Sequence, residues 1–302
     1  MPRRTFTATH ADSGRRLDRF LARELPAFDV EALAKAGRVR IRGKAASPMR
    51  KLWGNETIDV ELPDAVPIRA AEDAPEVPVL YQDSELIVVD KPPGLVVEDE
   101  GNGRSVVEIV GARVGGCAVG GVAAPGVAHR LDRETSGCLA LARTDAALAK
   151  LLSAFDQGLV DKRYLALVLG NPPDGLRLEG SYSRDPADPR RFTTRVRSAR
   201  KASLSFEVRA RLPGAALLEV VLETGRTHQI RVQLSEAGWP VLGDSIYGPD
   251  AARQHAAAKV LGRQALHAWK LSITGPLTVS AEAPIPADFE RARAVLEAGA
   301  GA

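Results

Sequence analysis

Cysteines and long apolar runs are scarce in this 302-residue chain, and each scarcity excludes a class of protein. The two cysteines, Cys117 and Cys138, cannot build a disulfide framework, and neither lies in a CxxC pair or a histidine cluster of the kind that binds zinc. No apolar run approaches the roughly 18 residues of a membrane span, and no apolar stretch of a signal peptide follows the basic residues at 3 and 4. We therefore expect a cytoplasmic protein with no membrane segment, no metal site and two small buried cysteines.

Strong net charge is also missing, but the charge that exists is unevenly distributed. The chain is 45% hydrophobic and 26% charged, which is ordinary globular composition, with a formal net charge of +3. Residues 1 to 62 contain 13 Lys and Arg against 8 Asp and Glu, so they carry +5, and the remainder carries −2. The basic N-terminal end fits a polyanionic partner or simply a solvated basic surface, and the charge alone favours neither.

Helix and strand periodicities predict a small α/β module over residues 14–62. Residues 17–25 have the spacing of an amphipathic helix, 30–36 predict a second helix that ends at a glycine, and alternation at 58–62 predicts a half-buried strand. The segment 63–78 is rich in Pro, Ala and acidic residues, shows no period, and is predicted to be a linker.

The rest of the chain, residues 79–290, predicts an α+β domain. Strand signals recur and helices interrupt them at 145–155 and after Thr227, a plausible N-cap. Pro213 and Gly214 separate two of the strands as a hairpin turn does. We expect a mixed, largely antiparallel central sheet with flanking helices. The predicted strands are 86–89, 138–142, 164–169, 204–212 and 217–222.

Three polar segments exceed what a hydrophobic core requires. Residues 129–137 hold five ionisable side chains directly before an apolar strand, although surface ion pairs would produce the same pattern. Residues 223–231 end a strand at a glycine and begin a helix with basic residues; this arrangement suits an anionic ligand or a well-capped helix with exposed arginines. Tyr164 enters a strand after 161–163, a position that core or rim tyrosines also occupy.

Taken together, the motifs of this chain resemble the RluA family of RNA pseudouridine synthases over residues 78–290. Two departures are Gln233 and Glu98, at positions where the resemblance leads us to expect histidine. The segment 14–62 resembles the small RNA-binding domain of ribosomal protein S-four. The motifs that carry the family resemblance are VVDKPPG at 88–94, HRLD at 129–132 with TSG at 135–137, KRYLAL at 162–167, GRTHQIR at 225–231, Gly243-Asp244 with Tyr247-Gly248, and QALHA at 264–268.

The resemblance implies the fold of that family and the isomerisation of uridine to pseudouridine, with no cofactor and no metal. It assigns the catalytic carboxylate to Asp132, which would attack the sugar or base or abstract a sugar proton; the sequence does not choose between these roles. It makes Arg226 the cation that pairs with Asp132. Tyr164 would stack on the uracil ring, with its hydroxyl available for the proton that leaves C5.

A uridine inside a helix cannot be reached, so the resemblance also implies that the nucleotide is flipped out. Arg130 would fill the gap and His129 would support the loop, although a salt-bridged arginine and a core histidine are open alternatives. Arg16, Arg19 and Arg38 would hold the RNA backbone. We expect a monomer acting on ribosomal RNA. The alternatives are transfer RNA as substrate, a non-catalytic ribosome assembly factor, and a base-releasing glycosidase or nuclease.

Overall fold

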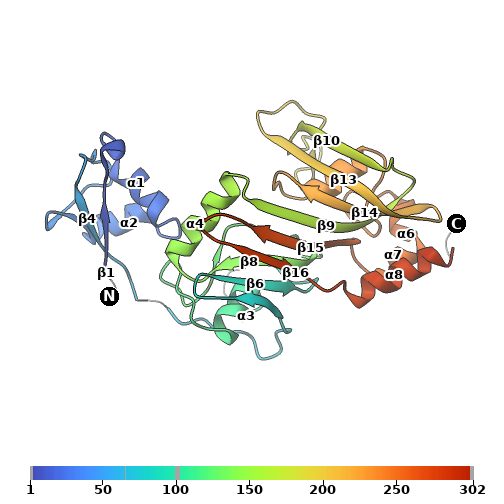
Figure 1. The fold of residues 1–302 in the computed structure, drawn as a ribbon, viewed down its shortest axis with the longest axis horizontal. Coiled ribbons are helices and arrows are strands. Elements are labelled where there is room, and N and C mark those ends of the chain that lie inside the picture. Colours follow the sequence, from blue (N-terminus) through green and yellow to red (C-terminus); the bar gives the residue numbers. More distant parts are fainter. Residues whose placement is uncertain (1–2, 65, 99–102, 300–302) are drawn as a thin grey trace.

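The computed structural model describes residues 3–64, 66–98 and 103–299, and its N-terminal part is a small sheet with two helices on it (Figure 1). The strand order is β1-β4-β2-β3, and every pairing in this sheet is antiparallel. A short 3-10 turn, η1, follows β1 at His10–Asp12. The elements are β1 (Arg3–Thr7), α1 (Leu17–Glu24), α2 (Val30–Lys35), β2 (Val39–Ile41), β3 (Lys44–Ala45) and β4 (Thr57–Glu61).

The helices of this module form where the periodicity predicts them. Leu17, Phe20 and Leu21 of α1 are buried on one helix face, and they join a hydrophobic core that also contains the inward residues of β2 and β4. Asp29 caps α2, because its carboxylate accepts a hydrogen bond from the backbone N–H of Ala32 (2.9 Å). Strand β1 lies before residue 14, so the predicted start of the module omits a strand of the same sheet.

The segment predicted as a linker, residues 63–78, is packed on the larger domain. Val66 forms an isolated bridge with Val122, while Ala74 and Val77 are buried in the core of the larger domain. An ion pair between Arg4 of β1 and Asp145 (3.0 Å) adds a direct contact between the module and that domain.

The larger domain is built on a ten-stranded sheet, which is mixed and largely antiparallel as predicted. Its main path is β10-β13-β14-β9-β15-β8-β6-β5, with β16 paired to β15 and β7 paired to β8. Among the described strands of this sheet, one pairing is parallel, and it joins β15 to β8. The strands are β5 (Val79–Gln82), β6 (Leu86–Lys91), β7 (Gly126–Val127), β8 (Ser136–Ala142), β9 (Val160–Leu169), β10 (Gly175–Ser181), β13 (Lys201–Leu212), β14 (Ala215–Leu222), β15 (Leu266–Ile273) and β16 (Val279–Glu282).

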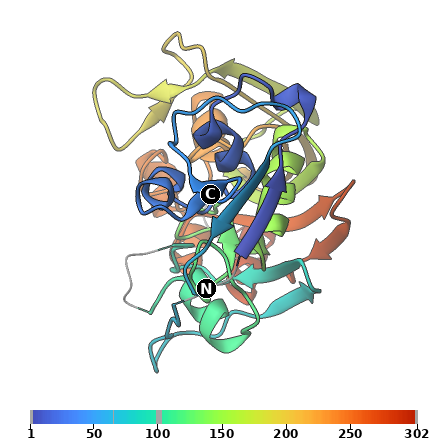
Figure 2. The same cartoon turned by 90° about the vertical axis from the view of Figure 1, so that its left-hand side faces the viewer.

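A two-stranded hairpin and six helices complete the described part of the domain. Figure 1 shows α7 and α8 together at one end of the sheet and α4 at the end nearer the N-terminal module. The hairpin strands β11 and β12 project from the body of the protein (Figure 2). These elements are β11 (Ser183–Arg184), β12 (Phe192–Thr193), α3 (Val106–Arg113), α4 (Asp145–Asp156), α5 (Gln229–Glu236), α6 (Asp250–Gln254), α7 (Ala256–Leu261) and α8 (Ala287–Glu297).

Both faces of the central strands are buried, which explains their almost continuous apolar runs. Successive side chains of a strand point to opposite faces. In β6, Ile87 and Val89 join the core that contains α3 and α8, while Leu86 and Val88 join a second core against α4. Strand β8 alternates in the same way. Both cysteines are buried, with free thiols, as expected.

Gly137 permits the close approach of β15 to β8 at the centre of the sheet. Its φ is +113°, and a Cβ at this position would lie 2.2 Å from the carbonyl oxygen of Ala268. The glycine of the TSG motif therefore allows the parallel pairing of these strands, and the polar loop 129–135 enters the sheet directly before it.

Candidate active site

The loop that carries Asp132 is held from several sides. The backbone N–H of Thr135 donates to the carbonyl oxygen of Asp132 (3.0 Å), which closes a tight turn. The carbonyl oxygen of Arg133 accepts from Nζ of Lys91 (2.8 Å) and from the backbone N–H of Gly94 (2.9 Å), so the DKPPG segment clamps the loop. Since the carbonyl groups of Asp132 and Arg133 are both bonded, the surrounding structure fixes the position of Asp132.

Residues 263–267, at the start of strand β15 and directly before it, support the same loop. Gln264 donates from Nε2 to Oγ1 of Thr135 (2.9 Å), and His267 shares a hydrogen bond through Nδ1 with Oγ of Ser136 (2.9 Å). Arg263 donates to the carbonyl oxygen of Glu134 (3.1 Å). These contacts explain why a motif distant in sequence accompanies HRLD, because it positions the loop.

Asp132 is paired with Arg231, which Asp244 holds in place. Nη1 of Arg231 donates to Oδ2 of Asp132 (2.8 Å), and its Nε and Nη2 form a two-point contact with the carboxylate of Asp244 (2.7 and 2.8 Å). The side chains of Arg231 and Asp244 are 3% and 1% exposed, whereas that of Asp132 is 23% exposed and faces the cavity. The arrangement presents one partly exposed carboxylate on a buried, fully engaged cation.

The electrostatics of the supporting pair keep both of its members charged. Burial raises the pKa of Asp244, but the hydrogen bond and charge of Arg231 and the backbone N–H groups of Tyr247 and Ile246 outweigh it, so the pKa lies below its ordinary value. Burial lowers the pKa of Arg231, but Asp244 and Asp132 raise it above its ordinary value. The Gly243-Asp244 motif is therefore the anchor of the cation that contacts Asp132.

The pairing of Asp132 with Arg226 that the sequence predicted is wrong for this structure. Among the described residues, the cation within ion-pair distance of Asp132 is Arg231. Arg226 is exposed in the turn before α5, and its Nε donates to the carbonyl oxygen of Lys201 (3.1 Å). Both arginines belong to the GRTHQIR motif, but only the second lies in a helix that faces the core.

Helix α5 is buried almost all round, and its polar residues are bonded internally. It begins at Gln229, and its N-cap is His228, one residue after the predicted cap Thr227. His228 adopts a left-handed conformation (φ +59°). Gln233 stands where a histidine was expected, and its Nε2 donates to carbonyl oxygens of Leu178 (3.2 Å) and Ala202 (3.4 Å). The substituted position is therefore structural and lies outside the cavity lining.

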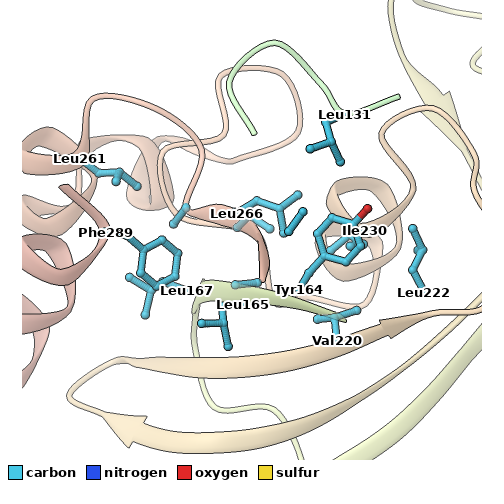
Figure 3. Close-up of a cluster of buried hydrophobic side chains, with 14 of the residues drawn as sticks. Leu131, Tyr164, Leu165, Leu167, Val220, Leu222, Ile230, Leu261, Leu266 and Phe289 are labelled. Atoms are coloured by element: carbon cyan, nitrogen blue, oxygen red, sulfur yellow. The ribbon is translucent and has the colours of Figure 1, made fainter. Parts of the chain in front are cut away.

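Tyr164 lies on β9 beside Asp132. Its ring packs among Leu131, Ile230 and Leu222, and its hydroxyl points toward the loop that carries Leu131 (Figure 3). Burial, and then the charge of Asp132, raise the pKa of Tyr164 well above its ordinary value. The side chain is therefore a neutral phenol at neutral pH, with an aromatic face suited to stacking.

His129 is a half-buried structural support, while Arg130 is exposed at the cavity. Nε2 of His129 accepts a hydrogen bond from the backbone N–H of Ala140 (3.0 Å), and its ring packs against Phe155 at 4.9 Å between centroids. Burial, with the charge of Lys162 as a smaller cause, lowers the pKa of His129 to about 3, so the ring is neutral. Both His129 and Arg130 line the cavity.

A cavity of about 930 Å³ brings the three main motifs together. The loop 127–133, the start of β9 and the segment 222–231 all line it, and it contains Asp132, Tyr164 and Arg226. This volume is ample for a nucleotide. In the described part of the chain, no group of three or more His, Cys, Asp or Glu residues is arranged to hold a metal ion.

Basic residues gather in two places outside the cavity. In the N-terminal module Arg19 is exposed, Arg38 is half-buried, and Arg16 donates to the carboxylate of Asp18 (2.6 Å). The segment 184–201, which includes β12, carries seven Lys and Arg against two Asp and was not singled out from the sequence. Because Arg226 bonds to Lys201, this basic segment adjoins the cavity.

The motifs contain Arg231, Asp244 and Lys162, but the family resemblance alone assigned no role to them. Arg231 stands between the apolar residues Ile230 and Val232 at the start of a predicted helix. A buried arginine needs a carboxylate partner, so this flanking was a usable signal for a buried ion pair. Nothing in the sequence identified the partner.

Comparisons with known proteins agree with this site. The family model for RNA pseudouridylate synthase matches residues 85–236. A ribosomal large subunit pseudouridine synthase D of Xanthomonas campestris is 36% identical, covering 94% of this chain and 89% of that protein. An RNA pseudouridine synthase of Chloroflexus aurantiacus is 35% identical, covering 91% and 88%. The solved structure of human RNA pseudouridylate synthase domain containing 1 shares the fold, with a TM-score of 0.59 at 24% identity, covering 70% of this chain and 84% of that one.

The fold and the motif-lined cavity thus define an isomerase that acts on RNA. The chain belongs to the RNA pseudouridine synthase family, as its motifs indicated. No helix in the described ranges is long and apolar enough to cross a membrane.

Proposed function

We propose that this protein isomerises uridines of large-subunit ribosomal RNA to pseudouridine, acting as a monomer in the cytoplasm, with Asp132 as its catalytic carboxylate. The observation that carries the proposal is the partly exposed Asp132 carboxylate, held by Arg231 at 2.8 Å, in a cavity that Tyr164 also lines. The names of similar proteins, among them the relative from Xanthomonas campestris, support the choice of ribosomal RNA.

In the proposed reaction the N1–C1′ bond breaks, the freed uracil turns, and a C5–C1′ bond forms. C5 then loses a proton and N1 gains one, so nothing is added to the RNA and no electrons are transferred. Asp132 either attacks the reacting nucleotide or abstracts a sugar proton, and both roles need an ionised carboxylate at a fixed position. Arg231 supplies the charged partner that holds this carboxylate in position, because it is itself engaged by two carboxylates.

Tyr164 is proposed to stack on the uracil and to keep the base within the cavity while it turns. A neutral phenol is a poor base, so its hydroxyl takes part in the proton transfer from C5 only if its own proton moves on at the same time. The nearby Asp132 carboxylate is a suitable acceptor.

The remaining predicted residues are proposed to bind RNA. Arg130, exposed at the cavity, would occupy the space left by the flipped nucleotide, and His129 would hold the loop as a neutral ring. Arg226, at the cavity and bonded to the basic segment 184–201, is reassigned to the RNA backbone. The N-terminal module, with Arg16, Arg19 and Arg38, would supply affinity more than sequence choice.

The test is pseudouridine mapping on total RNA from cells with and without the gene, rescued by the natural protein or by Asp132→Asn. We expect discrete sites in large-subunit ribosomal RNA to disappear and only the natural protein to restore them. If sites disappear only in transfer RNA, the substrate is transfer RNA and not ribosomal RNA. If no site changes in any RNA, the catalytic proposal gives way to a role in ribosome assembly.

A further inference from the structure

One buried cation in the cavity has no role in the reaction proposed above. Lys162 is 8% exposed and lines the cavity from the start of β9, two residues before Tyr164 on the same strand face. Among the described residues, Nζ of Lys162 has neither a carboxylate at ion-pair distance nor a hydrogen-bond acceptor. Burial is the sole cause that lowers its pKa to about 8.

Lys91 is a buried lysine with a structural role, and it provides a comparison for Lys162. Its Nζ donates to three carbonyl oxygens, those of Pro92 (2.8 Å), Leu95 (2.9 Å) and Arg133 (2.8 Å). Every ammonium donor is thus satisfied. Lys162 differs because it lines the cavity and has no hydrogen-bond acceptor among the described residues, and a buried charge without a hydrogen-bonded partner is destabilising.

The surroundings of Lys162 locate its ammonium group opposite the start of the 225–231 motif. It lies 5.4 Å from the centroid of the Phe155 ring, and a Cβ on Gly225 would be 3.4 Å from Nζ. Its charge also contributes to the low pKa of His129. The carboxylate of Asp132 already has Arg231 as its cation, so Lys162 is not needed for that pair.

We propose that Lys162 binds a backbone phosphate of the RNA next to the flipped uridine, so that its missing partner is supplied by the substrate. A phosphate diester carries one negative charge and several acceptor oxygens, which match an ammonium group with three free donors. Gly225 leaves room for this phosphate, because any side chain there would contact Nζ. The turn 225–228 leads into α5, whose N-terminal end also favours an anion.

This inference rests on the proposal that the cavity receives the target uridine, and the test uses a probe that does not depend on the natural target. Fluorescently labelled decauridylate can place a uridine in the cavity in any register. Its binding would be titrated at several salt concentrations with the natural protein, Lys162→Met and Lys162→Arg. Lys259→Met is the matched control, because Lys259 is an exposed lysine of α7 outside the cavity lining.

We expect Lys162→Met to weaken binding by roughly tenfold at low salt, as loss of one charged hydrogen-bonding group does. The slope of log K against log salt should fall by about 0.7, the value for one phosphate contact on a single strand. Lys162→Arg should keep the slope of the natural protein, and Lys259→Met should keep both slope and affinity.

A second probe tests the phosphate itself. Decauridylate with neutral methylphosphonate linkages lacks the backbone charge, so it should bind the natural protein more weakly than ordinary decauridylate, and the penalty should be smaller for Lys162→Met. Equal penalties, or equal salt slopes for the natural protein and Lys162→Met, would overturn the inference. The expected difference between ordinary and methylphosphonate decauridylate could also be found while the protein modifies no cellular RNA. That result would support the phosphate site at Lys162 and reject the proposed function.

Discussion

Two cations that line the cavity are buried in different settings. Arg231, the paired cation, bridges Asp132 and Asp244 and is engaged by both carboxylates. Lys162, the unpaired cation, is almost as deeply buried and has no carboxylate partner within the described structure. The paired cation holds a reacting group in place, whereas the unpaired cation keeps a charge available for a ligand. Stability and function therefore coincide at Arg231 and conflict at Lys162.

The largest effect should come from Asp132, the partly exposed carboxylate that the paired cation holds, and it should fall on activity. Asp132→Asn should lower the rate of pseudouridine formation by roughly 10⁴-fold, because an amide is neither a nucleophile nor a base. Nucleoside analysis of large-subunit ribosomal RNA transcribed in vitro and incubated with the protein would measure this. The fold and RNA affinity should persist, because Arg231 keeps Asp244 as its partner. Normal turnover in this variant would remove Asp132 from the mechanism.

The paired cation, Arg231, should have the larger effect on stability of the two arginines in its motif. Arg231→Met leaves the buried Asp244 carboxylate without its partner, so the free energy of unfolding should fall by roughly 3 kcal/mol or more. Denaturant unfolding measures the change. Arg226→Met is the matched control from the same motif, because Arg226 is exposed and its loss should change stability by less than about 1 kcal/mol. Similar losses for the two variants would contradict the different roles given to these arginines.

Replacing the unpaired cation, Lys162, should change the stability in the opposite direction. Lys162→Met removes an uncompensated buried charge, so the free energy of unfolding should rise by roughly 1 to 3 kcal/mol at pH 7. The pKa of Lys162 is about 8 in the folded protein and 10.5 in the reference state, so between these values the unfolded chain binds more protons. The natural protein should gain stability as pH rises through this window, and the advantage of the variant should shrink.

Denaturant unfolding of both proteins at pH 7, 9 and 10.5 would check this dependence. His129, whose pKa is lowered in part by the charge of Lys162, has a pKa of about 3 and stays neutral throughout. An advantage of Lys162→Met that is constant over this range, or a loss of stability at pH 7, would show that the lysine has a structural partner.

The smallest effect should come from the exposed arginine at the cavity. Arg226→Met should weaken binding of the in vitro transcribed ribosomal RNA severalfold, lower the salt slope by about 0.7 to 0.9, and leave turnover at saturating RNA nearly unchanged. Measuring kcat and KM separately would test this. A fall in kcat comparable to that of Asp132→Asn would restore Arg226 to the catalytic group.

Several elements with strong local signals were predicted, whereas the central strand β15 and the edge strands were not. The alternating residues of β4, the amphipathic α1 and the apolar run of β8 all formed where expected. Strand β10, at the edge of the large sheet, has a largely exposed and polar sequence, so no apolar pattern marked it. Strand β1 was missed for a similar reason, because its side chains alternate only between exposed and half-buried.

By itself the sequence determined the α+β class, the catalytic-loop motif around Asp132 and the family resemblance, because periodicity and ordered motifs are local properties of the chain. Only the tertiary structure decided that Arg231 pairs with Asp132 across 99 positions, that Asp244 anchors it, and that Lys162 is left unpaired. The sequence names no partner for either of the two arginines of this motif, which lie five residues apart. Burial and the packing of α5 against the Asp132 loop distinguish them, since a buried cation must find a carboxylate and an exposed one is already solvated by water.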